Sequence, residues 1–336
     1  MSMSQKENSL AALRHEVYDF MPSNFDHVMV GFGAVSGPDI EKGPQGGGPD
    51  GFGVHWVPTA SGDGSPVPCE TNHPMDSETI TEWKKLITFP DPGKCDWESY
   101  AKFELTMGDP SRQAVEFGFG NGPFERLVYM MGFQEALMAL ATEPEAAADF
   151  MSAVADYKID CLEYIKKYYH ADIVTNYDDI ATDQCTFMSP EVYRKCIKPA
   201  HKKIYDAVRA YGMIPLQHTC GRAESLIEDF IETGADGWTS VQPSNNISEL
   251  LQKYGNKFVF SGGYDTNGKP GQADASPEEV ISEVHRCVDT YGSHPGYMFF
   301  GFRLANSLNP QDHINAVAPI IKEAAIYRQN IKVNFE

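Results

Sequence analysis

The stretch Met213-Ile214-Pro215-Leu216-Gln217-His218-Thr219-Cys220-Gly221 joins a short apolar run to a group of polar side chains and a glycine. Runs of this kind recur from Ala114 onward, and stretches with the periodicity of amphipathic helices separate them. This alternation is typical of βαβ units that form a parallel sheet. It predicts six strands, at Ala114–Phe119, Asp172–Tyr177, Met213–Gln217, Gly237–Val241, Phe258–Ser261 and Tyr297–Phe300.

These repeats, with one or two further strands among the N-terminal aromatic segments, favour an α/β fold that closes as a (β/α)₈ TIM barrel. An open doubly wound sheet is the alternative fold. No Gly-x-Gly-x-x-Gly follows the first predicted strand, so a dinucleotide site of the Rossmann type is not indicated.

Capping signals mark the helices between the strands. Ser276-Pro277 pairs a capping residue with proline at the first helical position, and the apolar face that follows runs to Gly292. Ser189-Pro190 likewise begins a helix that we expect to reach Tyr211-Gly212. A further helix is predicted over Ala223–Thr233 and ends at Gly234.

The N-terminal third differs in composition from the rest of the chain. Gly31–Gly53 is rich in glycine and proline, which indicates turns and long loops. A long irregular stretch in a compact domain is often a lid or a binding loop. We therefore predict a single domain over 1–336, with irregular hairpin and loop additions over 1–101 and the main βα repeats over 102–336.

Charge and composition exclude some classes of function. The formal net charge is −20, and no cluster of Lys and Arg offers the contacts that a polyanion needs, so nucleic acid is not an expected partner. No apolar run approaches the roughly 20 residues that cross a bilayer. Seven scattered Cys and a polar start without a leader predict a cytoplasmic protein that no membrane anchors.

The chemistry of a barrel is expected at the C-terminal ends of its strands. His218 and Cys220 are two residues apart at such an end, and strand periodicity allows both to face one spot. Imidazole nitrogen and thiolate sulfur are ligands that Zn²⁺ prefers, and a catalytic zinc keeps one position open. In the alternative interpretation Cys220 is a packed thiol and His218 a substrate contact.

The end of the second predicted strand carries Tyr177-Asp178-Asp179. Adjacent side chains of an extended strand diverge, so at most one aspartate faces the barrel axis while the other caps a loop or pairs outside. Tyr177 could line the pocket with its ring, and Cys185 could reach the same rim. The carboxylates could instead satisfy backbone N–H groups. Three Cys fit packing roles in helices, whereas Cys69 and Cys95 have no predicted place; the three are Cys161, Cys196 and Cys287.

An ordered series of short motifs resembles the uroporphyrinogen decarboxylase superfamily over about 114–310. The opening Lys6–Arg14 and the stretch Asp50–Trp56 also look similar to members of this superfamily. The motifs of the series are Asn176-Tyr177-Asp178-Asp179, Ser189-Pro190-Glu191, Pro199-x-x-Lys202, His218-Thr219-Cys220-Gly221, Gly234-Ala235-Asp236 and Gly262-Gly263-Tyr264-Asp265.

The resemblance distinguishes two branches of that superfamily. Its decarboxylases have an Arg-rich N-terminal segment that binds the porphyrinogen carboxylates, whereas Arg14 is the only arginine before Ala101 here. The branch of cobalamin-dependent methyltransferases has a His-x-Cys motif that matches His218 and Cys220. This resemblance implies a barrel-bound zinc, and a corrinoid protein as the partner that carries cobalamin.

The resemblance also implies a third zinc ligand, commonly a Cys near the last strand, but Tyr297–Asn309 contains none. Related enzymes that demethylate methoxylated aromatics use other ligands, so Asp179, Glu116 or Cys185 could complete the site. Zinc would then act as a Lewis acid on the ether oxygen. By this resemblance, we expect Asp179, His218 and Cys220 to be the catalytic residues.

Several side chains are candidates for binding the substrate. Trp56, Tyr177 and Tyr264 could stack on a planar molecule. Glu116 ends the first strand, and Arg303 could pair with a substrate carboxylate or form a salt bridge at the rim.

Three functions remain open at this point. The first is a zinc-dependent methyltransferase that moves a methyl group from a small donor, such as a methoxylated aromatic, to a corrinoid protein. The second is a metal-free decarboxylase or lyase of the same fold. The third is a non-catalytic barrel that binds a small molecule.

Overall fold

The computed structural model describes residues 2–31, 41, 43–60 and 66–335. Over these residues seven parallel strands form one sheet, whose spatial order β1-β5-β6-β7-β8-β9-β10 follows the order of the chain. All six predicted strands are present, and β1 is the additional strand expected in the N-terminal third. The strands are β1 (His27–Val30), β5 (Ala114–Phe119), β6 (Ile173–Tyr177), β7 (Ile214–His218), β8 (Gly237–Val241), β9 (Val259–Gly263) and β10 (Tyr297–Phe300).

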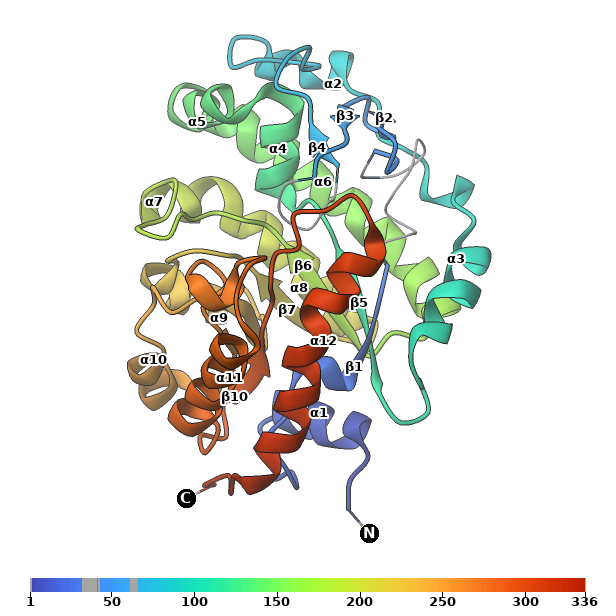
Figure 1. Cartoon of the computed structure of the whole chain (residues 1–336). Coiled ribbons are helices and arrows are strands. Elements are labelled where there is room, and N and C mark those ends of the chain that lie inside the picture. The colour runs from blue at the N-terminus through green and yellow to red at the C-terminus, as the bar shows by residue number, and fades with distance from the viewer. Residues whose placement is uncertain (1, 32–40, 42, 61–65, 336) are drawn as a thin grey trace.

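The sheet curls until its first and last strands approach each other. Ser23, just before β1, forms a parallel bridge with Phe299 of β10, whose N–H donates to the carbonyl of Pro22 at 2.9 Å. Asn24 accepts a hydrogen bond from Ser261 of β9. The result is the expected α/β fold, a TIM-barrel-like architecture with helices outside the sheet (Figure 1).

Helices follow the strands as the capping signals predict. The predicted helix after Ser276 begins with a capping box in which Ser276 and Glu279 each bond the other's backbone N–H. The helix after Ser189 is continuous but contains a π-helical turn at Tyr193–Ile197. The helices of the repeats are α4 (Pro123–Met131), α5 (Phe133–Thr142), α6 (Pro144–Tyr164), α7 (Pro190–Val192), α8 (Lys198–Ala210), α9 (Ile227–Glu232), α10 (Ile247–Tyr254), α11 (Pro277–Tyr291) and α12 (Pro310–Tyr327).

Helix α1 (Gln5–Leu13) closes the N-terminal end of the barrel. Its Leu13 is buried with apolar residues from the first halves of the strands, including Ala114, Ile173 and Ile214. In Figure 1, α1 lies at the lower end, so the C-terminal strand ends point to the upper end. The polar residues that follow the strands therefore gather at the upper end.

The N-terminal additions contain the expected hairpins and loops. Three short antiparallel strands, β2 (Gly48–Pro49), β3 (His55–Val57) and β4 (Val67–Pro68), form a small sheet. Two helices, α2 (Trp83–Leu86) and α3 (Trp97–Glu104), precede β5. The small sheet lies at the upper end of the molecule, near α4 (Figure 1). The glycine-rich stretch predicted over Gly31–Gly53 falls partly outside the described residues.

None of the helices within the described ranges combines the length and the apolar character that crossing a membrane requires.

Candidate metal site at the barrel mouth

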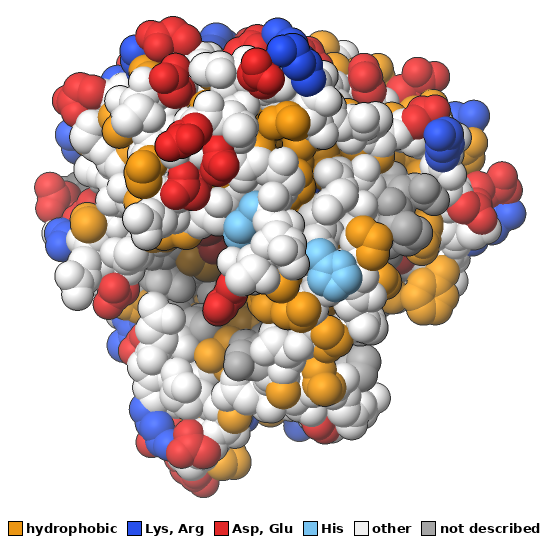
Figure 2. Space-filling view, turned by 90° about the horizontal axis from the view of Figure 1, so that it is seen from above, with side chains coloured by type: hydrophobic (Ala, Val, Ile, Leu, Met, Phe, Trp, Pro, Cys, Tyr) orange, Lys and Arg blue, Asp and Glu red, His pale blue; other side chains and the backbone are white. Residues whose placement is uncertain are grey.

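The C-terminal face of the barrel is the face seen from above in Figure 2. This face is hollowed, and hydrophobic, acidic and His side chains border the hollow. Polar residues at the ends of β6, β7 and β8 converge at this end of the barrel, as the architecture of parallel strands requires.

Three side chains from two strand ends come together here. Asp179, His218 and Cys220 each offer one ligand atom, and these three atoms lie within 4.8 Å of one another. The Sγ atom of Cys220 is 3.7 Å from Nε2 of His218, and the backbone N–H of Cys220 donates to Oδ1 of Asp179 at 2.7 Å. A carboxylate oxygen, an imidazole nitrogen and a sulfur are suitable donors for zinc, and three protein ligands leave a fourth position open. The donor set therefore fits zinc.

The ring of His218 is held on two sides. Its Nδ1 lies 2.8 Å from the hydroxyl oxygen of Thr239, and the ring stacks on Tyr177 with 4.1 Å between the centroids. Burial lowers the pKa of His218, although Asp179 and Glu116 oppose that shift. A neutral imidazole with Nδ1–H donating to Thr239 leaves Nε2 as the atom that can bind a metal.

Burial raises the pKa of the Cys220 thiol, and the neighbouring Asp179 carboxylate raises it further. Without a cation, the thiol form is therefore favoured at neutral pH. A coordinated metal ion changes that balance, because it deprotonates the thiol that binds it. The hydroxyl oxygen of Ser240 lies 3.3 Å from the same sulfur.

The two adjacent aspartates diverge, as the strand geometry predicts. Asp179 turns to the cluster, whereas Asp178 is buried and accepts hydrogen bonds from the backbone N–H groups of Phe124, at 3.1 Å, and Glu125, at 2.8 Å. These groups belong to the first turn of α4, where a carboxylate is favoured. Nε2 of His201 lies 2.7 Å from the same carboxylate. Asp178 thus fixes the helix that borders the cluster.

Glu116 and Cys185, the other candidates for a third ligand, do not join the cluster. Glu116 pairs in register with Ile173 at the start of β6, whereas Asp179 follows the end of that strand. The buried carboxylate of Glu116 lies 2.6 Å from Nδ1 of His27 and accepts a hydrogen bond from the hydroxyl group of Thr175 at 2.5 Å. Cys185 is exposed in the loop after β6. Register and exposure therefore leave Asp179 as the candidate that reaches His218 and Cys220.

Two residues predicted to bind substrate form hydrogen bonds with backbone carbonyls. The guanidinium of Arg303 donates to the carbonyls of Gln272, Ala273 and Ala275, at 2.7–2.9 Å. Its Nε and Nη2 donors therefore bind a loop of its own chain. The hydroxyl of Tyr264 donates to the carbonyl of Pro270 at 2.9 Å.

Sequence reasoning missed Glu125 and Tyr129 of α4. Tyr129 donates its hydroxyl hydrogen to Glu125 at 3.1 Å. Burial and then the charges of Asp179 and Asp178 raise the pKa of Glu125 well above its ordinary value, and the backbone N–H of Glu125 donates to Asp178, the neighbour of Asp179. Pro123 at the first helical position marks the start of α4 directly after β5, so this signal could have drawn attention to Glu125.

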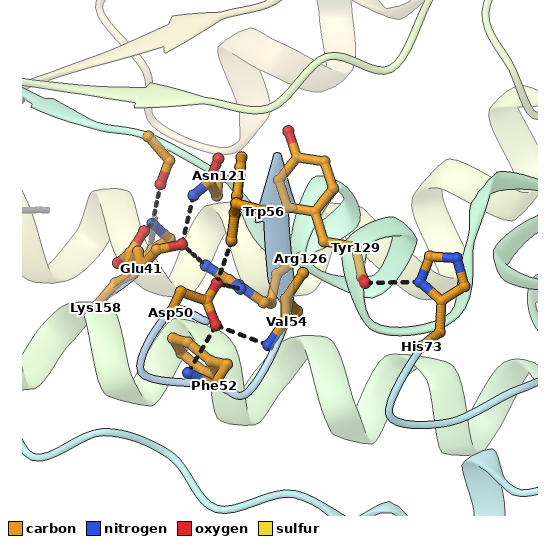
Figure 3. A network of polar contacts seen from close by, with 11 residues as sticks. Glu41, Asp50, Phe52, Val54, Trp56, His73, Asn121, Arg126, Tyr129 and Lys158 are labelled. Carbon is orange, nitrogen blue, oxygen red and sulfur yellow. Dashed lines mark hydrogen bonds and ion pairs between the residues drawn. The ribbon is translucent and has the colours of Figure 1, made fainter. Parts of the chain in front are cut away.

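A buried ionic network attaches the N-terminal additions to this region (Figure 3). Asp50 accepts from Arg126 at 2.7 Å and from the indole N–H of Trp56 at 3.0 Å. The Trp56 ring meets Tyr129 edge-on, with 5.2 Å between the centroids. Trp56, which we expected to stack on substrate, is thus buried in the wall beside α4.

The second half of the network fixes Glu41. The ammonium group of Lys158, on α6, lies 2.9 and 3.1 Å from the carboxylate oxygens of Glu41, and Asn121 donates to its backbone carbonyl at 2.8 Å. Lys158 and Glu41 are both buried (Figure 3). A buried ion pair is favourable only in a narrow range of geometries, so Lys158 fixes the position of Glu41.

Comparison with known families and curated proteins gives one consistent result. A family model described as uroporphyrinogen decarboxylase (URO-D) matches residues 74–323. The uroporphyrinogen decarboxylase of Magnetococcus marinus is 29% identical over 107 residues, which cover 30% of this chain and 27% of that protein. The enzyme of Alcanivorax borkumensis is 32% identical over 89 residues, 25% of this chain and 22% of that protein. The chain spans about a quarter of the length of these curated relatives.

A solved structure extends the likeness over almost the whole fold. The methyltransferase from Methanosarcina mazei aligns with a TM-score of 0.60 and 14% sequence identity, over 96% of this chain and 99% of that one. At that identity, the likeness concerns the fold.

Proposed function

We propose that this chain, which belongs to the uroporphyrinogen decarboxylase family, is a zinc-dependent methyltransferase. It would move a methyl group from a small donor, such as a methoxylated aromatic compound, to a corrinoid protein that carries cobalamin. The observation that carries the proposal is the cluster of Asp179, His218 and Cys220 at the barrel mouth. The fold shared with the Methanosarcina methyltransferase is in keeping with it.

The residues at the barrel mouth would have different roles. Asp179, His218 and Cys220 would hold the zinc, and Thr239 would keep His218 in the tautomer that presents Nε2. A bound zinc supplies Lewis acidity to the ether oxygen of the donor. The electron pair of the broken carbon–oxygen bond would stay on that oxygen, which would then take up a proton. The methyl group would pass as a cation equivalent to cob(I)alamin of the partner protein, which would supply the electron pair of the new bond.

The walls of the mouth would orient the donor. Tyr177 lies flat against His218 and presents an aromatic surface beside the ligands. The carboxyl of Glu125, whose pKa burial and Asp179 raise, would stay protonated more readily than an ordinary glutamic acid. In that form it can donate a hydrogen bond to the oxygen that loses its methyl group.

Metal analysis tests the proposal directly. We expect about one zinc per chain by native mass spectrometry and elemental assay, and much less after Cys220→Ser. Cys185→Ser is the matched control, because it removes an exposed thiol on the same rim. Zinc-loaded protein should transfer methyl groups from methoxyarenes to cob(I)alamin. A protein that binds no zinc, or a Cys220→Ser variant with unchanged zinc and activity, would contradict the proposal.

The similarity to curated uroporphyrinogen decarboxylases supports a second candidate, a metal-free decarboxylase or lyase. This function predicts CO₂ release from a carboxylated substrate after complete chelation of metals. Loss of turnover on chelation, with recovery on zinc addition, would exclude it.

A further inference from the structure

Strand β8 is irregular next to the cluster. Its pairing with β9 shifts register between Thr239 and Val241, which identifies a β-bulge at Ser240. Ser240 has a φ of 62°, in the left-handed region that residues other than glycine seldom adopt. Bulges are frequent beside active sites, where they redirect a side chain.

The bulge changes where two neighbouring hydroxyl groups point. In a regular strand, adjacent side chains face opposite sides of the sheet. Here the hydroxyl oxygen of Thr239 lies 2.8 Å from Nδ1 of His218, and that of Ser240 lies 3.3 Å from Sγ of Cys220. Both hydroxyl groups therefore contact candidate metal ligands of the neighbouring strand end.

The next strand leaves space for this bulge. Gly262 of β9 also has a positive φ, 153°. A Cβ atom at Gly262 would lie 2.4 Å from the carbonyl oxygen and 2.6 Å from the nitrogen of Val241. Only a residue without a side chain fits against the bulged backbone, so two adjacent strands share the irregularity.

We propose that Thr239 and Ser240 are metal-positioning residues, which the β8 bulge brings together to orient His218 and Cys220. This inference rests on the proposed zinc site. Thr239 accepts the Nδ1 hydrogen of His218 and so directs Nε2 to the metal. Ser240 donates its hydroxyl hydrogen to the sulfur of Cys220 and keeps it turned to the same point. Partners of this outer kind tune metal affinity by about 10–100-fold.

Zinc affinity of the full-length protein, measured by competition with a chromophoric chelator, tests the inference without relying on turnover. Ser240→Gly, Ser240→Ala and Thr239→Val should each weaken zinc binding by about 10–100-fold. Glycine adopts a positive φ freely, so Ser240→Gly removes the hydroxyl group without straining the backbone. Ser244→Ala, at an exposed serine in the loop after β8, is the matched control and should bind zinc as the wild type does.

Cobalt substitution supplies an independent reading of ligand geometry. The thiolate-to-Co²⁺ charge-transfer band should shift or weaken in both Ser240 variants, because their sulfur loses a hydrogen-bond donor. Thr239→Val should change the band less, since Thr239 contacts the imidazole rather than the sulfur.

The outcomes separate this inference from the proposed function. If Cys220→Ser abolishes zinc binding but Ser240→Gly and Thr239→Val bind zinc as the wild type does, the positioning role is wrong and the metal site stands. If only Ser240→Ala loses affinity, backbone strain rather than the hydroxyl group is responsible, and the role of Ser240 is also wrong. A wild-type protein without zinc affinity would overturn both proposals.

Discussion

Substitution of the two adjacent aspartates at the end of β6 should have different effects: a change at Asp178 should lower the stability of the protein, and a change at Asp179 its zinc affinity. Asp178→Ala removes the acceptor of three hydrogen-bond donors, the N–H groups of Phe124 and Glu125 and the imidazole of His201. All three contacts involve a buried carboxylate, and at about 1–1.5 kcal/mol each their loss lowers the free energy of unfolding by about 3–4.5 kcal/mol. This is a large part of the roughly 5–15 kcal/mol that stabilises a typical domain.

Asp179→Asn is the matched comparison. Its amide oxygen can still accept the hydrogen bond from the backbone N–H of Cys220, so the unfolding free energy of the zinc-free protein should stay within about 1 kcal/mol of the wild type. Zinc affinity should fall by more than about 100-fold, since loss of a ligand exceeds the effect of an outer partner.

Urea unfolding followed by circular dichroism, and chelator competition for zinc, measure the two effects. With a slope of about 3 kcal/mol per molar urea, Asp178→Ala should lower the midpoint by about 1–1.5 M. An exposed acid of the following loop supplies the control, because Asp183→Ala should leave the midpoint unchanged. Equal stability of Asp178→Ala and wild type, or undiminished zinc binding by Asp179→Asn, would refute the division of roles between the two carboxylates.

Three further predictions concern charge. Burial and nearby carboxylates raise the pKa of Glu125, so the folded zinc-free protein binds a proton there more tightly than the unfolded chain and loses stability as pH rises. Glu125→Gln should therefore raise the urea midpoint at pH 8 and leave it unchanged near pH 4. Equal gains at both pH values would contradict this prediction. Lys158→Met should lower the free energy of unfolding by about 3–5 kcal/mol, because it leaves Glu41 buried without its cation. Lys203→Met, at an exposed ion pair, is the control and should lower it by less than about 1 kcal/mol in the same urea assay. Three backbone carbonyls occupy the Nε and Nη2 donors of Arg303, so uncharged methoxyarenes should be better methyl donors than methoxybenzoates of the same shape. A higher kcat/KM for the benzoates would show that Nη1 of Arg303 or another cation receives the carboxylate.

The order of secondary structure and two of the three residues of the candidate metal cluster could be predicted from local patterns. The apolar runs predicted six strands, and the capping residues Ser189 and Ser276 predicted where helices begin. The two-residue spacing of His218 and Cys220 placed both near one spot. Each of these features depends on residues close together in the chain, which is why periodicity and capping rules reach them.

Other features of the site lie beyond such rules. Three candidates for a third ligand remained open, because the register between β5 and β6 decides that Glu116 lies near Ile173 while Asp179 reaches the mouth. Glu125 lies beside the end of β6 because Asp178 accepts a hydrogen bond from its backbone N–H, a contact between residues 53 positions apart. The additions before β5 owe their position to buried ion pairs with α4 and α6.

The bulge at Ser240 shows most clearly the difference between what the local sequence and what the tertiary structure determines. Serine has no intrinsic preference for a positive φ, so the sequence of β8 by itself predicts a regular strand with Thr239 and Ser240 on opposite faces. Gly262 of the neighbouring strand leaves room for the bulge, and the two hydroxyl groups contact His218 and Cys220 at the end of β7. Local sequence thus determined which strands form and, to within two residues, where each strand ends: β7 ends at His218 rather than Gln217, and β9 at Gly263 rather than Ser261. Tertiary structure alone decided which side chains meet, because register, closure and bulges depend on contacts between strands far apart in the chain.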